Sequence, residues 1–174
     1  GENFVSGSYH ADNVAPIILG GVTLVRSISD LDIVKLPSPK SLEMIIIRPN
    51  IEIKTSDSRR VVKKKVKIAK MVQQSANLGA FISSLYSEDF DLMSRSVVDE
   101  VVEPDRSILI PEFESIKKIS TESGALSCGI SGSGPSIFSL SNNSEISKII
   151  LKNICSHLDK VNIDYDSFIS KVNS

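Results

Sequence analysis

The sequence has little of what would mark a membrane protein or a nucleic-acid-binding protein. Among 174 residues, lysine and arginine number 20 and aspartate and glutamate 21, so the formal net charge is −1. A balanced charge gives no general attraction to nucleic acid or to an anionic membrane. No apolar run approaches the ~20 residues of a membrane span, and the start Gly-Glu-Asn lacks the basic and apolar parts of a signal peptide. We therefore expect a cytoplasmic protein with no nucleic-acid or membrane partner.

Cysteine is also scarce. Cys128 and Cys155 have no metal-type spacing, and we interpret them as free thiols in a reducing compartment. The length fits one domain, or one domain plus the end of another. Because the chain also lacks an initiator methionine, we expect an excised piece that begins in the middle of a fold.

Polar residues stand at the start of an apolar segment near the beginning of the chain. His10, Asp12 and Asn13 precede a short apolar run, which ends in a glycine pair. This order predicts a buried helix over residues 10–21, capped by Asp12 or Asn13, with Pro16 in its first turn. One cap needs only one such side chain, so the remaining polar groups are candidates for binding a charged small molecule.

A hairpin and a break follow. Residues 22–36 alternate apolar and polar side chains around Ser29-Asp30, which predicts a β-hairpin. Pro37-Ser38-Pro39 interrupts any periodic structure, and we place a domain boundary there.

The remainder of the chain predicts a second, larger domain. Its expected elements are a central strand at 42–48, helices at 55–86, 88–98, 111–122 and 144–159, and strands at 125–130, 137–140 and 161–165. This order predicts an α+β sandwich whose helices cover one face of the sheet.

Seven basic residues lie between Arg59 and Lys70. On a continuous helix, four of them share one stripe opposite an apolar one: Arg59, Lys63, Lys67 and Lys70. We interpret the stripe as a solvated helix face. A nucleic-acid surface is disfavoured because no aromatic residue is interleaved with the charges.

Three further features have open interpretations. The loop G-I-S-G-S-G-P-S at 129–136 is an anion-binding nest or a tight hairpin without a ligand. It is neither a Walker loop nor a dinucleotide fingerprint. Arg106, beside Asp105 and Glu103, reads as a surface ion pair, and Glu2 as a solvated terminal acid.

Two of these stretches resemble a known family. H-A-D-N-V-A-P-I-I-L-G-G and G-A-L-S-C-G-I-S-G-S-G-P-S are similar to the homoserine kinases, a family within the GHMP small-molecule kinases. T-S-D-S-R-R and E-P-D-R-S-I-L-I-P resemble the same family in the same order, so the likeness extends to about Leu140. The glycine-rich loop is typical of all GHMP kinases, whereas His-x-Asp-Asn is more specific to homoserine kinases.

The resemblance implies a two-domain enzyme. Its first domain is ribosomal-protein-like and holds the ATP phosphates on a loop of the form P-x-x-x-G-L-G-S-S-A, and its second is ferredoxin-like. This sequence contains no such loop. The resemblance therefore implies that residues 1–38 are the tail of the first domain and residues 39–174 the whole second domain. The missing N-terminal part of the enzyme is then an expected partner, and a homodimer is a further expectation.

The resemblance also implies an activity, the ATP-dependent phosphorylation of the hydroxyl of L-homoserine in threonine biosynthesis. In this family Glu2 would bind Mg²⁺, His10 would contact the substrate, and Asp12 and Asn13 would meet its hydroxyl. Phosphoryl transfer requires in-line positioning and charge neutralisation, which such groups supply. No lysine partner for Asp12 stands out in the sequence, so its action as a general base is left open.

The remaining roles concern the second domain. The resemblance implies that the guanidinium groups of Arg59 and Arg106 pair with the substrate carboxylate. Thr55 would lie near the transferred phosphoryl group. The loop residues that would pack against the missing phosphate loop are Gly132, Ser133 and Gly134.

Two alternatives are kept. The first is another GHMP kinase, although paired arginines favour an amino-acid carboxylate over a sugar. The second is a non-catalytic ferredoxin-like module that binds an amino acid. The missing phosphate loop favours this module, whereas Glu2 and the Asp12-Asn13 pair favour the enzyme.

Overall fold

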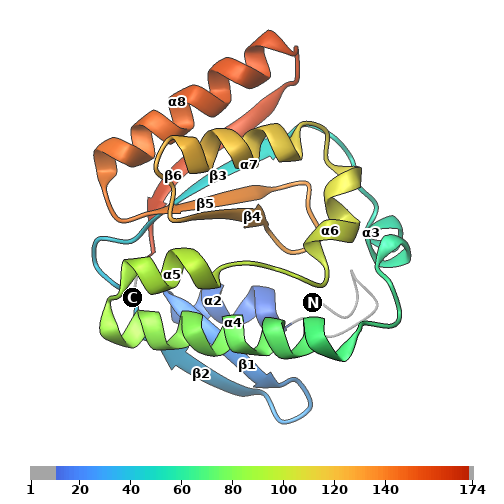
Figure 1. Ribbon diagram of the computed structural model, residues 1–174, viewed down its shortest axis with the longest axis vertical. Helices are drawn as coiled ribbons and strands as arrows, with labels where there is room; N and C mark the ends of the chain where they lie inside the picture. The colour runs from blue at the N-terminus through green and yellow to red at the C-terminus, as the bar shows by residue number, and fades with distance from the viewer. Residues whose placement is uncertain (1–10, 173–174) are drawn as a thin grey trace.

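The structure is a computed structural model that describes residues 11–172 (Figure 1). Among these residues, no helix is long and apolar enough to cross a membrane. The elements in chain order are α2 (Ala11–Leu19), β1 (Val22–Ser27), β2 (Asp32–Leu36), β3 (Glu43–Pro49), α3 (Thr55–Val61), α4 (Ile68–Ser87), α5 (Phe90–Ser96), α6 (Glu103–Arg106), the 3-10 helix η1 (Ser107–Leu109), α7 (Phe113–Glu122), β4 (Ser127–Ile130), β5 (Ile137–Ser141), α8 (Ser144–Lys160) and β6 (Tyr165–Lys171).

Four strands form one antiparallel sheet in the order β4-β5-β3-β6, and β1 and β2 form a separate hairpin. Helix α7 lies between β3 and β4 in the chain, and α8 lies between β5 and β6. This strand order with two crossing helices is the ferredoxin-like arrangement. The apolar run of β3 suits a central strand, where Ile45 pairs with Ser139 on one side and Ile169 on the other. The predicted α+β, ferredoxin-like fold class is confirmed.

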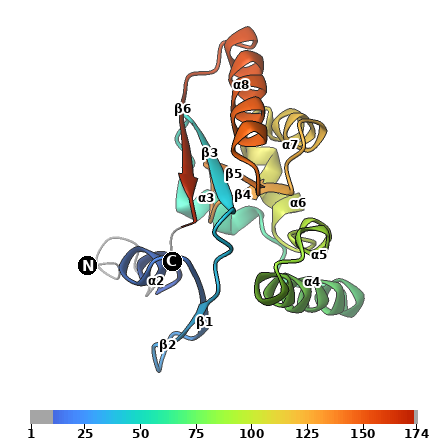
Figure 2. The same ribbon diagram turned by 90° about the vertical axis from the view of Figure 1, so that its left-hand side faces the viewer.

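One face of the sheet is covered by α7 and α8 (Figure 2). Alternate residues of β3, Ile45 and Ile47, point into this layer, as the two-residue period of a strand requires. Their partners recur at helical spacing on the two helices. The buried helical residues of this core are Phe113, Ile116, Ile150, Ile154 and Leu158.

The opposite face packs against α4, α5 and the hairpin. Leu140 of β5 forms a second buried cluster with Leu36, Leu42, Leu85 and Met93. The prediction that helices cover one face therefore holds for α7 and α8 only. The second cluster joins the β1–β2 hairpin to the larger sheet and so fixes where α2 lies.

Helix α2 forms as predicted, but its surroundings differ from the expectation. It begins at Ala11, so Asp12 and Asn13 lie inside its first turn rather than at the cap, and Pro16 lies in the second turn. The expected buried helix is exposed on its outer side, where Ile17 is 82% accessible. Ala15 is the buried residue of α2 within the part of the chain that the structure describes.

The predicted basic helix is interrupted. Residues 62–67 separate α3 from α4, so the four basic residues of the predicted stripe do not share one helix face. Lys63 leaves the helical path because its main-chain N–H and its Nζ both donate to Asp105 of α6, at 3.0 and 2.8 Å. This pairing lowers the pKa of the Asp105 carboxyl.

The last helix and strand give a mixed result. Asn143 caps α8 through its side-chain oxygen, which accepts from the main-chain N–H of Glu145 and Ile146. The last strand was predicted at 161–165 but runs from Tyr165 to Lys171. It lies at the sheet edge, where Phe168 is 60% exposed, and its mixed polar sequence carries no clear alternation.

Candidate functional site

The glycine-rich loop between β4 and β5 is a structured turn. Ser131 donates its main-chain N–H to Ser136, and Gly134 donates to Ser131, so the loop is closed by its own hydrogen bonds. Gly132 and Gly134 have φ angles of +60° and +80°, which favour glycine. A side chain at Gly134 would also meet Ile110 at 2.9 Å. Glycine at position 134 therefore serves both the turn and a close approach to the segment that follows η1.

Arg106 ties this loop to two helices. Its Nη1 donates to the main-chain oxygen of Gly132 at 2.7 Å, and its Nε donates to the oxygen of Ser58 in α3 at 3.4 Å. The buried hydroxyl of Ser58 donates in turn to the oxygen of Ser133 at 2.9 Å. The expectation of a surface ion pair for Arg106 is wrong, because its neighbouring carboxylates pair elsewhere. Instead, Arg106 joins α3, α6 and the glycine loop.

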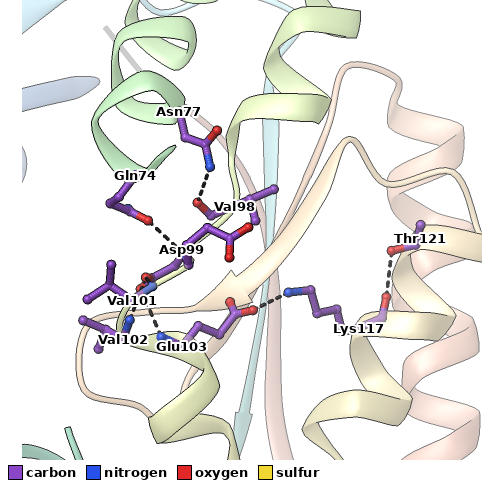
Figure 3. Close-up of polar contacts among 10 residues, drawn as sticks. Gln74, Asn77, Val98, Asp99, Val101, Val102, Glu103, Lys117 and Thr121 are labelled. Atoms are coloured by element: carbon purple, nitrogen blue, oxygen red, sulfur yellow. Dashed lines mark hydrogen bonds and ion pairs between the residues drawn. The ribbon is translucent and has the colours of Figure 1, made fainter. Parts of the chain in front are cut away.

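The segment before α6 is held by a polar network (Figure 3). One carboxylate oxygen of Asp99 accepts from the N–H groups of Val101 and Val102, each at 2.8 Å, and the other accepts from Glu103 at 3.2 Å. A carboxylate suits the N-terminus of a helix, where these groups have no partner within the helix. Asp99 thereby fixes the N-terminus of α6, and the position of α6 in turn determines the position of Arg106.

Helix α4 holds the same segment from the other side. Gln74 accepts from the N–H of Glu100 at 2.9 Å, and Asn77 donates to the oxygen of Val98 at 3.2 Å (Figure 3). Gln73 donates to the side-chain oxygen of Asn77 at 2.9 Å. Gln74 and Asn77 of α4 therefore bind the main chain of the connection.

A partly buried ion pair connects α6 to α7. Glu103 and Lys117 of α7 form a close contact, with side chains 11% and 34% exposed (Figure 3). Lys117 also lies 5.7 Å from the centre of the Phe113 ring. Since α6 has only four residues, it depends on this contact and on Asp99 for its position.

Two neighbouring cavities meet at the glycine loop. The larger, of about 410 Å³, lies between α2, the hairpin and the sheet, and Asp12 and Gly132 are among its lining residues. The smaller, of about 200 Å³, is lined by residues that include Arg106, Asp99 and Gly132. The residues that line both are Phe81, Val97, Ile130, Gly132 and Phe138. Asp12 and Arg106 thus line two adjacent cavities, although they lie 94 positions apart in the numbering of the chain.

The other predicted site residues have varied positions. Asn13 is exposed next to Asp12, and Arg59 is exposed on α3, next to Ser58. Thr55 opens α3. His10 and Glu2 lie outside the described residues. In the glycine loop, the main-chain oxygen of Ser133 accepts from the hydroxyl of Ser58, and Gly132 lines both cavities.

Comparison with known proteins decides the family. A sequence model of the family described as GHMP kinases C terminal matches residues 69–160, more than half of the chain. The chain belongs to the GHMP kinases. The matched region runs from α4 to the end of α8 and so includes the glycine loop and Arg106.

The proteins that are similar to this chain include homoserine kinases and a mevalonate kinase. A crystal structure of homoserine kinase from Cytophaga hutchinsonii has a TM-score of 0.96 and 45% identity, and the match covers 99% of this chain and 55% of that chain. Homoserine kinase from Chlorobaculum tepidum is 42% identical over 150 residues, 86% of this chain and 46% of its own length. A mevalonate kinase from L. major, at 16% identity and a TM-score of 0.67, shares the fold. The chain spans about half the length of the curated relatives it matches.

Several residues of this GHMP site were not predicted from the sequence. Ser58 was not singled out, although it follows Asp57 in a segment recognised as similar to the family. Asp99, Gln74 and Asn77 each bond to main-chain groups, and no pattern of residue types predicts such contacts. Lys117 lies 14 positions after Glu103, on another helix. Only the folded chain brings this pair together.

Proposed function

We propose that the chain forms the substrate-facing and C-terminal part of a homoserine kinase, which transfers a phosphoryl group from ATP to the hydroxyl of L-homoserine. The observation that carries the proposal is the pair of adjacent cavities that share Gly132, one lined by Asp12 of α2 and the other by Arg106. The 45% identity to a homoserine kinase over 99% of this chain supports that substrate over others. We place residues 1–38 in the first domain of that enzyme and residues 39–174 in the second.

In the proposed reaction, the substrate hydroxyl lies at Asp12 and Asn13, at the start of α2. The Asp12 carboxylate accepts a hydrogen bond from the hydroxyl and orients its oxygen for in-line attack on the γ-phosphorus. As the new O–P bond forms, the bond to the leaving β-phosphate oxygen breaks, and the hydroxyl proton is released to Asp12 or to water. The exposed first turn of α2 presents main-chain N–H groups that favour a neighbouring negative charge.

Arg106 binds the carboxylate of the amino acid in this proposal. One of its nitrogens is committed to Gly132 and a second to Ser58, which fixes the plane of the guanidinium group. The guanidinium group has five N–H donors, so donors remain after these two contacts. Arg59, on the exposed side of α3, supplies a second positive charge for the same carboxylate. Thr55, where α3 begins, is assigned to the phosphoryl side of the site.

ATP and Mg²⁺ belong to the proposal as the phosphoryl donor and its counter-ion. Magnesium binds one or two carboxylates together with substrate phosphates, and Asp12 is a carboxylate that lines the larger cavity. Glu2 is the further ligand that we propose. Within residues 11–172, no group of three or more His, Cys, Asp or Glu is arranged to hold a metal ion. When bound, Mg²⁺ neutralises the phosphate charge.

The proposal is tested by reconstitution. The chain is co-expressed with the N-terminal part of the Cytophaga hutchinsonii homoserine kinase, and ADP release is measured with ATP, Mg²⁺ and one substrate at a time. We expect release with L-homoserine above that with L-serine or mevalonate, and loss of it with Asp12→Asn. ADP release with mevalonate but not homoserine would favour another GHMP kinase.

A binding module without catalysis is the second candidate, and calorimetry separates it. The module binds L-homoserine with the affinity unchanged by the N-terminal partner, and the reconstituted pair stays inactive. The proposed enzyme predicts that the chain alone has little affinity for ATP, because it contains no phosphate loop. Micromolar binding of ATP to the chain alone contradicts that prediction.

A further inference from the structure

The basic segment between α3 and α4 borders a cavity that the proposed reaction does not use. Residues 62–67 run along one side of the molecule, from the end of α3 to the start of α4 (Figure 1). The cavity has a volume of about 330 Å³, and four lysines line it: Lys63, Lys65, Lys67 and Lys70. We call it the lysine cavity. Its volume is that of a site for a small molecule.

The charges that line the lysine cavity are unbalanced. Its acidic lining residues are Glu100 and Asp105, so four ammonium groups face two carboxylates. Lys63 is paired with Asp105 at 2.8 Å. The ammonium groups of Lys65 and Lys67 have no hydrogen-bond or ion-pair partner among residues 11–172. The cavity therefore has an excess of two positive charges, which suits a ligand with two negative charges.

These lysines lie at the end of α4 where positive charge is unfavourable. The helix begins at Ile68, and Lys67 occupies the N-cap position without a capping hydrogen bond from its side chain. No acidic residue occurs from Ser58 to Ser87. The N-terminus of a helix carries a partial positive charge, so added cations destabilise it and an anion stabilises it. An anion in the lysine cavity would offset both the lysines and the helix dipole.

The remaining lining residues indicate what kind of anion fits. Val66, Val101 and Pro104 form an apolar part of the wall. No lining residue is aromatic, so the cavity offers no surface for stacking the bases of a nucleic acid. Lysine binds phosphate as a point charge, and a phosphate monoester carries a charge of about −1.5 to −2 at neutral pH. The lysine cavity thus suits a small phosphate monoester whose carbon part contacts the apolar wall.

The segment that contains α6 separates the lysine cavity from the candidate site. Asp105 lines the lysine cavity, whereas its neighbour Arg106 lines the cavity of about 200 Å³ at the glycine loop. Lys63 donates its main-chain N–H and its Nζ to Asp105, and Lys70 donates its Nζ to the main-chain oxygen of Glu100 at 3.1 Å. A phosphate group would compete for both ammonium groups. Its binding would therefore weaken two contacts that hold the segment around α6.

From these features we propose that the lysine cavity is an effector site for a small phosphate monoester, and that its occupancy weakens binding of the amino-acid substrate by displacing Arg106 through α6. The effect on the substrate rests on the function proposed above, whereas binding of the phosphate monoester does not. Allosteric coupling requires two distinct sites and an element that both affect, and α6 is that element here.

The binding test uses the complete gene product that carries this chain, saturated with ADP and Mg²⁺ to fill the nucleotide site. Phenyl phosphate is the probe, and calorimetry in about 0.15 M salt screens its attraction to exposed lysines in general. We expect saturable binding at one site. Inorganic phosphate binds more weakly because it lacks the carbon part, and benzoate binds more weakly still because it has one negative charge.

Paired variants locate the bound probe. Lys65→Gln combined with Lys67→Gln weakens binding of phenyl phosphate by about 10-fold or more. The melting temperature of this variant is unchanged or higher, because cations are removed from the N-terminus of α4. Lys40→Gln combined with Lys152→Gln is the control. It changes the net charge equally at two exposed lysines outside the lysine cavity and leaves the dissociation constant unchanged.

Steady-state kinetics of the same gene product tests the coupling. Phenyl phosphate raises KM for homoserine several-fold, with little change in kcat or in KM for ATP. The Lys65→Gln and Lys67→Gln double variant has native kinetics without the probe and loses the response to it. Asp105→Ala raises KM for homoserine without the probe, because it removes the contact between Lys63 and α6.

Three results overturn the proposal: no binding of phenyl phosphate, equal dissociation constants for the two double variants, or binding that leaves KM for homoserine unchanged. Binding of a single-stranded oligonucleotide, but not of phenyl phosphate, overturns it in favour of a nucleic-acid surface. Calorimetry requires no catalysis. A gene product that binds phenyl phosphate at the lysine cavity but phosphorylates no homoserine therefore contradicts the proposed function and the coupling, and leaves the binding site supported.

Discussion

Arg106 and Gly132 are joined by a hydrogen bond of 2.7 Å from the guanidinium Nη1 to the main-chain oxygen. The contact links the short helix α6 to the tip of the β4–β5 loop. Because Arg106 also donates to Ser58 of α3, one side chain fixes three segments that line or border the two cavities. An arginine is suited to this task, since its planar group donates in several directions at once.

The first prediction concerns this link. In the reconstituted enzyme, Arg106→Ala lowers kcat/KM for homoserine by about 10- to 100-fold, because charge-assisted hydrogen bonds are worth roughly 1.5–3 kcal/mol. Arg106→Lys recovers only part of the loss, since an ammonium cannot make both main-chain contacts in the same plane. Arg95→Ala is the matched control, because Arg95 is an exposed arginine that bonds within α5. Equal kinetics for Arg106→Ala and Arg95→Ala would show that Arg106 has no role in the site.

The second prediction concerns the ion pair between Glu103 and Lys117. Lys117→Met leaves the Glu103 carboxylate only 11% exposed and without its cation, so we expect a loss of about 1–3 kcal/mol in the free energy of unfolding. Adding Glu103→Gln recovers part of it. Urea denaturation of both single variants and the double variant gives the coupling. Additive losses would mean that the pair does not stabilise α6.

The sequence predicts the elements that bury a regular pattern of apolar residues, and it fails for elements that depend on distant contacts or lie exposed. The apolar run of β3 and the apolar residues at helical spacing on α7 and α8 predict the main core. The structure confirms that these residues are buried together. The break between α3 and α4 is not visible in the local pattern, because it depends on Asp105, 42 positions after Lys63. The edge strand β6 is missed for a related reason, since an exposed strand has little alternation to detect.

The site divides in the same way. Asp12, Arg106 and Gly132 stand out as residue types, and they line two adjacent cavities that share Gly132. The polar network that holds the segment before α6 cannot be recognised in the sequence. Asp99 and Asn77 bond to main-chain groups, which are the same at every position. The roles of Arg59, Thr55, His10 and Glu2 rest on resemblance and stay predictions.

The third prediction compares three glycines. Gly134→Ala costs about 1–3 kcal/mol, because it combines a positive φ with a contact at 2.9 Å to Ile110. Gly132→Ala costs less, about 1 kcal/mol, since it has the positive φ but open space. Gly79→Ala, inside α4 and in open space, stabilises by up to ~1 kcal/mol. Chemical denaturation of the three variants ranks them, and an equal cost at positions 132 and 134 would contradict the role of Ile110.

The fourth prediction concerns acid stability at the start of β3. The hydroxyl of Ser144 donates to Glu43 at 2.7 Å, and this hydrogen bond is the main cause that lowers the pKa of the Glu43 carboxyl. A carboxyl with a lowered folded-state pKa contributes stability above its unfolded-state pKa and loses it as pH falls through the folded-state value. We therefore expect the stability difference between the native chain and Glu43→Gln to be largest near neutral pH and to shrink below about pH 4.5.

Denaturation at several pH values between ~3 and ~7 measures that difference. Glu52→Gln is the control, because Glu52 is an exposed glutamate outside this contact. A difference for Glu43→Gln that stays constant over this range would mean that the contact does not depend on the charge of Glu43.

The fifth prediction separates binding from chemistry at Asp12. If Asp12 orients the substrate hydroxyl, Asp12→Asn keeps the shape of the side chain but removes its charge, so the substrate still binds while its oxygen is a poorer nucleophile. We expect kcat to fall by about 10²- to 10⁴-fold, with a much smaller change in KM. Asn13→Ala, one position further along the exposed turn, removes a hydrogen bond and lowers kcat/KM by about 10-fold. Steady-state kinetics of the reconstituted enzyme checks both, and a rise in KM at unchanged kcat for Asp12→Asn would assign Asp12 to binding alone.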